Sequence, residues 1–244
     1  MDNKKVFLSY CVTCMNRIEQ LKKTLPYNMD RLKDDEQLCL VNFNSKDGLD
    51  EWISENFIEY IKNEKLIYFY TKEPKYFDMS KAKNLSHRLS NSEWVFNLDG
   101  DNYITQKTRI CIENASKEFD NFFIWERGIP LDGSGGRICV KRKEFFNIGG
   151  YDEIYDFVSQ HDYDLQKLLC LNKKICIRQT CDKRPIKNSK TETAANTRSK
   201  VYSDYSSANK KKFESKIRNN IIKNNELGYK IYRGILNFEH DMFL

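Results

Sequence analysis

The spacing of hydrophobic residues predicts alternating strands and helices over the first hundred residues. Short apolar runs, which are typical of strands buried on both faces of a parallel sheet, recur at 6–12, 38–41, 66–70 and 94–98. Between these runs, hydrophobic residues recur every three or four positions, which predicts amphipathic helices near 18–25, 49–61 and 81–90. This β-α-β-α-β-α-β order is that of a Rossmann-like half with right-handed crossovers, and no GxGxxG motif follows the first strand to indicate a dinucleotide site.

The pattern changes after residue 102. The sequence predicts a helix over 104–120 and strands over 122–125 and 136–140, with a glycine-rich loop at 128–136 whose composition fits a mobile cover over a ligand. Hydrophobic residues return at helical spacing from Asp162 onward. Asp162 is therefore expected in the first turn of a helix, where the helix dipole favours its anionic form.

The apolar run at 94–98 leads directly into two carboxylates, Asp99 and Asp101, with Gly100 between them. Because Gly100 permits a sharp turn, both carboxylates are expected at the carboxyl end of a buried strand, where the ligands of open α/β sheets bind. Two hard oxygen ligands in a tight turn suit Mg²⁺ or Mn²⁺ bound to a diphosphate, since these ions take phosphate oxygens as further ligands. The alternative is an Asp-Gly turn with solvated carboxylates.

Composition places the chain among globular proteins. Its 244 residues are 40% hydrophobic and 13% aromatic, which is ample for one large domain, or a domain with an appendage, and argues against disorder. No apolar run approaches 18 residues, and the run at the amino terminus is too short for a signal peptide. The eight cysteines lie mainly in hydrophobic contexts, which indicates a reducing cytoplasm, and we expect Cys11 and Cys14 to pack in the core rather than bind metal.

Positive charge is concentrated in the last quarter of the chain. The net charge is +6, but residues 182–244 alone hold 14 basic and 7 acidic side chains, a net charge of +7. This segment combines a polar stretch at 187–207, expected as a loop or partly ordered lid, with a basic amphipathic helix from 210 and an aromatic end at 229–238. Such an end suits an anionic membrane surface. Two alternatives are a solvated helix face and packing of the same apolar stripe on the main domain.

Four blocks of sequence resemble, in order, the family 2 inverting glycosyltransferases of the GT-A fold, including relatives with a galactosyltransferase-type carboxyl half. The blocks lie at 13–17, at 41–48, at 82–84 with 98–101, and at 149–153 with 160–165. Each block alone is a weak signal, whereas four in sequence over about residues 5–170 are a strong one. The resemblance implies an α/β GT-A fold with a mixed central sheet. It divides the chain into a single catalytic domain at 1–185 and a basic loop with a helical C-terminal extension at 186–244.

The resemblance implies a nucleotide-sugar donor, most often a UDP-sugar, bound along the first half of the chain. The positions that correspond to the family's donor site are Thr13, Arg17, Asn42, Asn44, Lys83, Asn84, Asp99 and Asp101. Asn42 or Asn44 stands where the family commonly has an aspartate at the uracil, and Lys83 where it often has an arginine near the nucleotide. Asp99 corresponds to the carboxylate near the ribose, and Asp101 to the ligand of a Mn²⁺ or Mg²⁺ ion.

The resemblance also implies a base and an acceptor site. Asp162 corresponds to the catalytic base, which takes the proton of an acceptor hydroxyl as that hydroxyl attacks the anomeric carbon. Gly150, Tyr151 and His161 correspond to the acceptor side, and for His161 the alternative is an exposed histidine at the start of the helix. For Asp164 a structural role is favoured, since it lies two residues further along the same helix and faces elsewhere.

The family's second metal ligand has no counterpart here. Many relatives carry a metal-binding histidine after the base helix, but residues 185–190 contain none. Lys187 or Lys190 is then the candidate for neutralising the phosphates.

The resemblance therefore predicts a cytoplasmic enzyme of polysaccharide biosynthesis. It would transfer a sugar, with inversion and metal assistance, to a glycan or lipid-linked acceptor, and the basic end would contact the inner face of the membrane. A sugar nucleotidyltransferase is one alternative, but it normally has a glycine-rich phosphate loop after the first strand, and residues 10–15 contain no glycine. A basic nucleic-acid-binding module is another. It leaves Asp99, Asp101 and Asp162 unexplained, so no nucleic-acid partner is expected.

Overall fold

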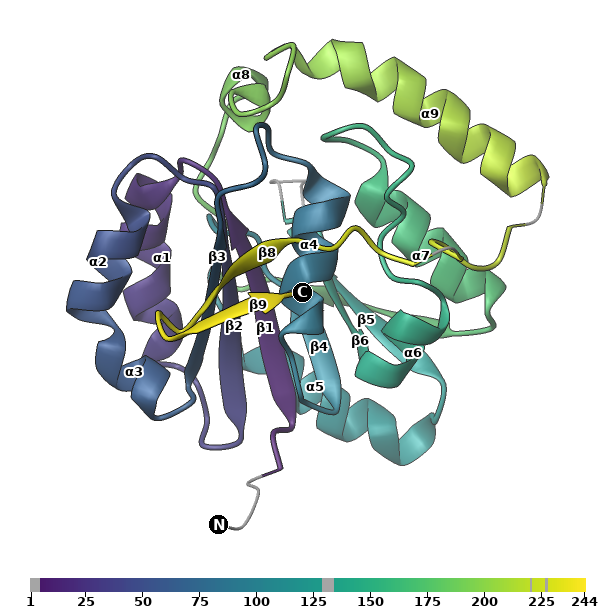
Figure 1. Ribbon diagram of the computed structural model, residues 1–244. Helices are drawn as coiled ribbons and strands as arrows, with labels where there is room; N and C mark the ends of the chain where they lie inside the picture. Colours follow the sequence, from purple (N-terminus) through teal and green to yellow (C-terminus); the bar gives the residue numbers. More distant parts are fainter. Residues whose placement is uncertain (1–4, 129–133, 220, 227) are drawn as a thin grey trace.

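The computed structural model describes residues 5–128, 134–219, 221–226 and 228–244. Within these residues, nine strands form one mixed sheet in the order β7-β5-β6-β4-β1-β2-β3-β8-β9 (Figure 1). The predicted glycine-rich loop at 128–136 falls partly on residues 129–133, which lie outside the described residues.

The first half of the chain forms the parallel centre of the sheet, as the apolar runs predict. The strands are β1 (Leu8–Cys14), β2 (Glu36–Phe43), β3 (Leu66–Thr71) and β4 (Trp94–Asn97). The helices between them are α1 (Ile18–Met29), α2 (Leu49–Asn56), α3 (Ile58–Lys62) and α4 (Met79–Arg88). The predicted helix over 49–61 is divided into α2 and α3 because the backbone leaves helical geometry at Phe57, where φ is −128°.

The second half extends the sheet beyond β4 with both strand directions. Its elements are α5 (Gln106–Glu118), β5 (Phe122–Arg127), β6 (Arg137–Lys141), α6 (Arg142–Asn147), α7 (His161–Leu171) and β7 (Ile175–Thr180). β6 runs antiparallel to both β4 and β5, whereas β5 and β7 are parallel. The predicted mixed central sheet is therefore present.

Helices cover both faces of the sheet. Residues of α1, α2, α3 and α5 pack into the core on one face, and residues of α4, α6 and α7 pack on the other. Cys11 and Cys14 are buried, as predicted, and burial raises the pKa of the Cys14 thiol to about 12. No helix in the described ranges is long and apolar enough to cross a membrane.

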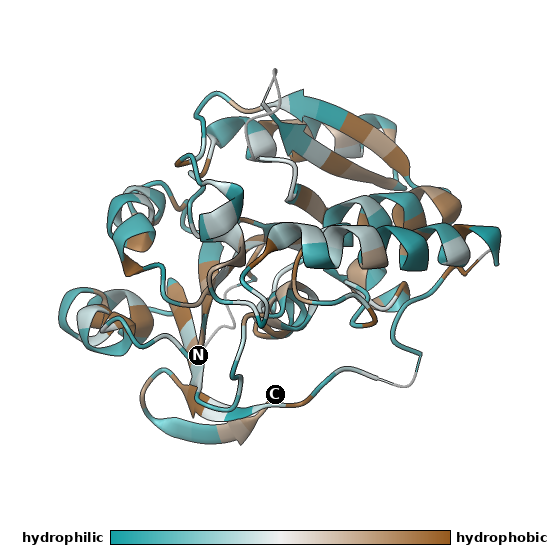
Figure 2. Ribbon diagram, turned by 90° about the horizontal axis from the view of Figure 1, so that it is seen from above, coloured by the Kyte–Doolittle hydropathy of each residue, from teal (hydrophilic) through white to brown (hydrophobic). Residues whose placement is uncertain are grey.

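The C-terminal segment ends in strands rather than in a free amphipathic tail. It forms α8 (Lys190–Ala194), α9 (Tyr202–Arg218), β8 (Arg233–Leu236) and β9 (His240–Phe243), so the polar stretch predicted as a loop contains α8 and the start of α9. α9 carries mostly hydrophilic residues (Figure 2).

The β8–β9 hairpin continues the sheet antiparallel to β3. Tyr232 is buried, and its ring lies 5.2 Å from that of Phe43. The apolar stripe at 229–238 thus packs on the sheet, which is the packing alternative of the sequence interpretation.

Candidate active site

Three charged side chains meet beyond the carboxyl end of β4. Lys83 lies on α4, Asp99 follows β4, and Asp162 is in the first turn of α7. The ammonium nitrogen of Lys83 is 2.9 Å from Oδ1 of Asp162 and 3.3 Å from Oδ1 of Asp99. Lys83 is fully buried, whereas the two carboxylates remain partly exposed. The site thus joins residues that are 16 to 79 positions apart in the sequence and that belong to two of the four sequence blocks.

The lack of a side chain at Gly136 leaves space for these three charged groups. A Cβ atom at position 136 would lie 2.9 Å from Oδ2 of Asp99, 3.0 Å from Oδ2 of Asp162 and 3.3 Å from Nζ of Lys83. The buried amide of Asn97 donates to Oδ1 of Asp99 (3.2 Å) and to the carbonyl of Gly136 (2.8 Å), which ties the start of β6 to the carboxylate. Sequence reasoning did not select Gly136 or Asn97. Only the antiparallel pairing of β4 with β6 brings position 136 to this place.

The charges within the cluster depend on one another. Burial raises the pKa of Asp162, and Asp99 adds to the rise, while the ammonium of Lys83 opposes it. Burial disfavours the charged form of Lys83, but the two carboxylates outweigh that effect and raise the pKa of Lys83. Lys83 is therefore a charged ammonium that opposes the rise in the pKa of Asp162.

The loop before α7 forms the floor of the site. Tyr151 is buried with its ring 5.1 Å from the Lys83 ammonium, and its hydroxyl makes no hydrogen bond of regular geometry within the described residues. Burial and the charge of Asp162 raise the pKa of Tyr151, so this hydroxyl is protonated beside the carboxylate. Gly150 has φ of +60°, and a Cβ atom there would lie 2.7 Å from Oδ1 of Asn84. Gly150 is thus placed for close packing of the loop on α4.

Asn84 holds this loop instead of pointing toward Lys83. Its amide nitrogen donates to the carbonyl of Tyr151 (2.8 Å) and to Glu153 (2.9 Å), and its oxygen accepts from the Tyr151 N–H (2.9 Å). The side-chain amide of Asn84 thus makes all of its hydrogen bonds within the protein. It fixes the backbone around Tyr151, and its amide is not free to bind a donor.

His161 is buried, which contradicts the interpretation of an exposed histidine at the helix start. Its Nδ1 lies 2.6 Å from the hydroxyl of Ser80, whereas its Nε2 has no hydrogen-bond partner among the described residues. Burial lowers the pKa of His161 to about 3, with a further contribution from Lys83. The imidazole is therefore neutral, and its contact with Ser80 fixes the ring.

Asp101 lies at a second polar cluster, beside the C-terminal segment. Its carboxylate accepts hydrogen bonds from the amides of Asn102 (2.6 Å) and Asn188, and its backbone carbonyl accepts from Ile186 (2.8 Å). Arg17 donates to the amide oxygen of Asn188 (3.0 Å) and to the carbonyl of Glu192. Burial, with a smaller effect of Asp99, raises the pKa of Asp101 to about 6.

These residues offer oxygen ligands for a hard divalent cation. The carboxylate of Asp101 is desolvated and is a ligand type of Mg²⁺ and Mn²⁺, whereas Asn188 turns its amide nitrogen to Asp101 and its oxygen to Arg17 (3.0 Å). No group of three or more histidine, cysteine, aspartate or glutamate side chains suited to a metal was found in the described residues, so most of the ligands would have to come from a bound diphosphate. Asn188 lies in the segment 185–190, where the sequence shows no histidine. Lys187 and Lys190, the predicted phosphate neutralisers, are exposed on either side of it.

The predicted nucleotide end lies at the carboxyl ends of β1 and β2. Thr13 is the second-last residue of β1, and it pairs with Val41 of β2. Asn42 is buried and engaged, since its amide donates to Asp50 (2.7 Å) and its oxygen accepts from the Ser45 N–H (2.8 Å). Asn44 has φ of +64° and donates to the carbonyl of Pro74, while its buried oxygen has no partner within the described residues. Of the two asparagines, Asn44 therefore has the available acceptor.

Asp164 faces away from the Lys83 cluster. It is buried, and both of its oxygens lie 2.7 Å from the ammonium of Lys216. The hydroxyl of Tyr155 also donates to it (2.9 Å). This placement is the structural role that helix geometry favours for a residue two positions after Asp162.

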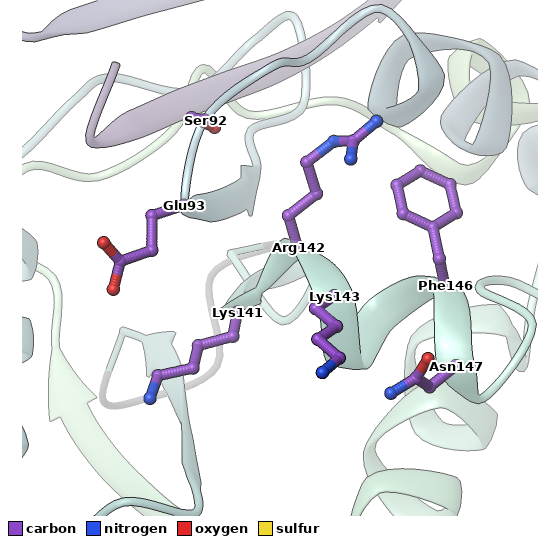
Figure 3. Close-up of a pocket in the computed structure, with 7 residues that line it drawn as sticks. All are labelled: Ser92, Glu93, Lys141, Arg142, Lys143, Phe146 and Asn147. Carbon is purple, nitrogen blue, oxygen red and sulfur yellow. The ribbon is translucent and has the colours of Figure 1, made fainter. Parts of the chain in front are cut away.

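A separate hollow of about 520 Å³ lies at the opposite end of the sheet, beside the amino end of β4 (Figure 3). It is lined by Ser92, Glu93, Lys141, Arg142, Lys143, Phe146 and Asn147. None of the predicted site residues belongs to it, and β4 separates Glu93 from Asp99. It is therefore distinct from the candidate active site.

Comparison with known proteins identifies the fold. No protein-family model and no curated protein matches the chain. S. aureus TarS, residues 1–349 in complex with UDP, is similar with a TM-score of 0.58 and 14% identity, and the match covers 78% of this chain and 63% of that one. The mannosyltransferase PcManGT from Pyrobaculum calidifontis, in complex with GDP-Man and Mn²⁺, has a TM-score of 0.59 and 14% identity, covering 80% and 62%. TarS in complex with UDP-GlcNAc gives a TM-score of 0.56.

The likeness confirms the GT-A fold that the sequence resemblance implies. At 14% identity it establishes the architecture, and the chain spans less than two thirds of the length of the first two of these structures.

Proposed function

We propose that the protein is an inverting glycosyltransferase that moves a sugar from a nucleotide-sugar, in the first instance a UDP-sugar, to an acceptor hydroxyl. The observation that carries the proposal is the meeting of Asp99, Lys83 and Asp162 at the carboxyl end of β4. The fold is shared with structures that hold UDP, UDP-GlcNAc and GDP-Man, which supports a nucleotide-sugar as the donor. A glycan or lipid-linked saccharide is the acceptor class, and synthesis of a polysaccharide in the cytoplasm is the setting.

Asp162 is the proposed base. Its partly exposed carboxylate accepts the proton of the acceptor hydroxyl while the hydroxyl oxygen attacks the anomeric carbon. The bond between that carbon and the diphosphate breaks in the same step, which inverts the configuration. Lys83 keeps Asp162 anionic between turnovers, and the neutral ring of His161 packs behind it without competing for the proton.

Asp101 is the proposed protein ligand of Mn²⁺ or Mg²⁺, with further ligands from the donor diphosphate. When bound, such an ion offsets the negative charge that develops on the leaving diphosphate. Arg17 contacts Asn188 and adds a fixed positive charge at the same place. Thr13, Asn44 and Asp99 are the proposed contacts to the nucleoside, at the ends of successive parallel strands.

The proposal is tested by incubating the protein with a panel of UDP- and GDP-sugars and Mn²⁺ and measuring release of the nucleoside diphosphate. We expect release from at least one donor, loss of release in EDTA, and recovery on adding Mn²⁺ or Mg²⁺. Full activity in EDTA would remove the metal and leave Arg17, Lys187 or Lys190 to neutralise the phosphates. Formation of a nucleoside triphosphate and a sugar 1-phosphate when pyrophosphate is added to the same mixture would instead indicate a nucleotidyltransferase. Failure to bind or cleave any donor contradicts the proposal.

A further inference from the structure

One face of α9 contacts the segment that carries the proposed base. Tyr205, Asn209, Lys212 and Lys216 are spaced at i, i+4, i+7 and i+11, which places them on one side of the helix. All four contact residues 152–164, which lead into and begin α7. Figure 1 shows α9 running across this part of the molecule, above α7.

Asn209 makes the most direct of these contacts. It is fully buried, and its amide nitrogen donates to the carbonyls of Asp156 (2.8 Å), Val158 (2.8 Å) and Ser159 (3.3 Å). Its amide oxygen accepts from the N–H of Asp156 (2.9 Å). One side chain therefore contacts four backbone groups in a short loop that has no regular hydrogen-bonding pattern of its own.

Two lysines and a tyrosine reinforce the contact on either side. Lys212 donates to the carbonyl of Ile154 (2.8 Å) and pairs with Asp156 (2.7 Å). Lys216 bridges Asp152 (2.9 Å) and Asp164 (2.7 Å), and it is buried. The ring of Tyr205 lies 4.9 Å from that of Phe157. Lys212 and Lys216 belong to the excess positive charge of the C-terminal segment, and their charge is used inside the protein.

The held segment has an unfavourable backbone. Phe157, Ser159 and Gln160 have φ values of 46°, 81° and 71°, all in the left-handed region that glycine favours. Residues with side chains occupy this region only where surrounding contacts impose it. Gln160 is also the residue that precedes the first turn of α7, and its side chain makes no capping hydrogen bond. The position at which α7 begins therefore depends on contacts from outside the segment.

We propose that Asn209 is a positioning residue for the base. By holding the loop at 156–160 in its left-handed conformation, Asn209 fixes where α7 begins and so places Asp162 against Lys83. The inference rests on the proposed role of Asp162 as base. It assigns α9, which lies outside the four blocks that resemble the glycosyltransferases, a part in the chemistry.

The test compares Asn209→Ala with Lys211→Ala, which removes an exposed side chain from the same helix. A catalytic group displaced by about 1 Å costs on the order of 10²-fold in rate, so we expect kcat of Asn209→Ala to fall by about that factor. The Kd for UDP should stay within about twofold, because the proposed nucleotide contacts lie at the ends of β1, β2 and β4. Lys211→Ala should match the wild type in both measurements.

Rescue by glycine separates positioning from general damage. Ser159→Gly removes the penalty for φ of 81°, so adding it to Asn209→Ala should restore kcat by about tenfold or more. No gain from Ser159→Gly, together with a parallel loss of UDP affinity in Asn209→Ala, would overturn the proposal. If Asn209→Ala does not fold, Lys212→Met, at a half-buried position, should show the same selective loss of kcat to a smaller extent.

Hydrogen exchange provides a readout that does not depend on sugar transfer. The amides of residues 156–162 should exchange faster in Asn209→Ala than in the wild type or in Lys211→Ala. Unchanged exchange would overturn the positioning role. Faster exchange in a protein that cleaves no donor would leave the structural role of Asn209 standing while the proposed function fails.

Discussion

Lys83 is the residue on which the electrostatics of the site depend. A buried ammonium is costly unless it is paired, and this one is paired with a carboxylate on each side. Of these two, Asp162 is the proposed base and Asp99 is a proposed contact to the donor. The same positive charge would then contact both the acceptor side and the donor side of the proposed site.

Replacing Lys83 should change the pH dependence of transfer. Asp162 acts when ionised, so activity falls as the pH drops through its pKa. Burial raises that pKa and Lys83 opposes the rise, so in Lys83→Met the pKa rises further and the acid limb of kcat/KM moves up by about 1–3 pH units. Lys83→Arg keeps the charge and should leave the limb near its wild-type position. An acid limb that stays in place in Lys83→Met would show that the ion pair does not set the ionisation of the base.

Gly136→Ala should damage the site more than the fold. The added methyl group would lie 2.9 Å from Asp99 and 3.0 Å from Asp162, and both of the touched atoms are ends of side chains that can move. The melting temperature should therefore change little, while displacement of the carboxylates lowers transfer by about 10²-fold. Transfer assays and thermal unfolding of the same preparation check this. Equal activity with wild type would mean that the carboxylates do not work in the observed positions.

Part of the site could be predicted from residues and part could not. Asp99 and Asp101 follow an apolar run with a glycine between them, which is a local signal. Lys83 and Asp162 carry no local signal that joins them across 79 positions, and only the order of the family's blocks indicated that both belong to the site. Asn188 and Gly136 were missed because their roles depend on which strand or loop lies opposite.

At the scale of elements, length and periodicity decided what could be predicted. The central strands were visible because they are apolar runs buried on both faces, and α1 and α7 were visible because their buried residues recur at helical spacing. β8 and β9 have four residues each, which is too short to show either a strand period or a helix period, so the same stripe fits a strand or a membrane-facing helix. Pairing with β3 decides in favour of the strand.

Gly234→Ala tests the attachment of the C-terminal hairpin. A Cβ atom at 234 would lie 2.3 Å from the backbone carbonyl of Tyr70, and a backbone atom cannot move aside as a side chain can. We expect the hairpin to separate from β3, with a lower melting temperature and faster hydrogen exchange at Tyr68 and Tyr70, whose N–H groups face the hairpin. Wild-type exchange at these two positions would mean that the observed pairing is not the one in solution.

At the scale of the whole molecule, the excess basic side chains of residues 182–244 fall into two groups, one in internal ion pairs and one exposed to solvent. Lys212 and Lys216 turn inward to acidic groups of the loop before α7 and of α7 itself, and Arg233 pairs with Asp241 across the hairpin. Lys210, Lys211 and Arg218 are exposed. An anionic surface would therefore meet less positive charge than the net charge of +7 implies.

Membrane contact is expected to be weak and dependent on salt. Each basic residue near an anionic surface contributes up to about 1 kcal/mol, and screening removes that attraction as ionic strength rises. Cosedimentation with vesicles that contain acidic lipid should show binding at low salt that disappears at high salt, with vesicles of neutral lipid as the control. No binding at low salt would leave the internal ion pairs and the packed hairpin as the uses of the basic segment.

The measurement that tests the account most directly is the transfer rate of Asp162→Asn at saturating donor and acceptor. The change keeps the shape of the side chain and removes its capacity to accept a proton, and base catalysis is worth about 10²–10⁴-fold. We predict a loss of that size with donor affinity nearly unchanged, while Asp164→Asn, which alters the carboxylate paired with Lys216, loses far less. Near-normal transfer by Asp162→Asn, or an equal loss in Asp164→Asn, would contradict the assignment of Asp162 as the base.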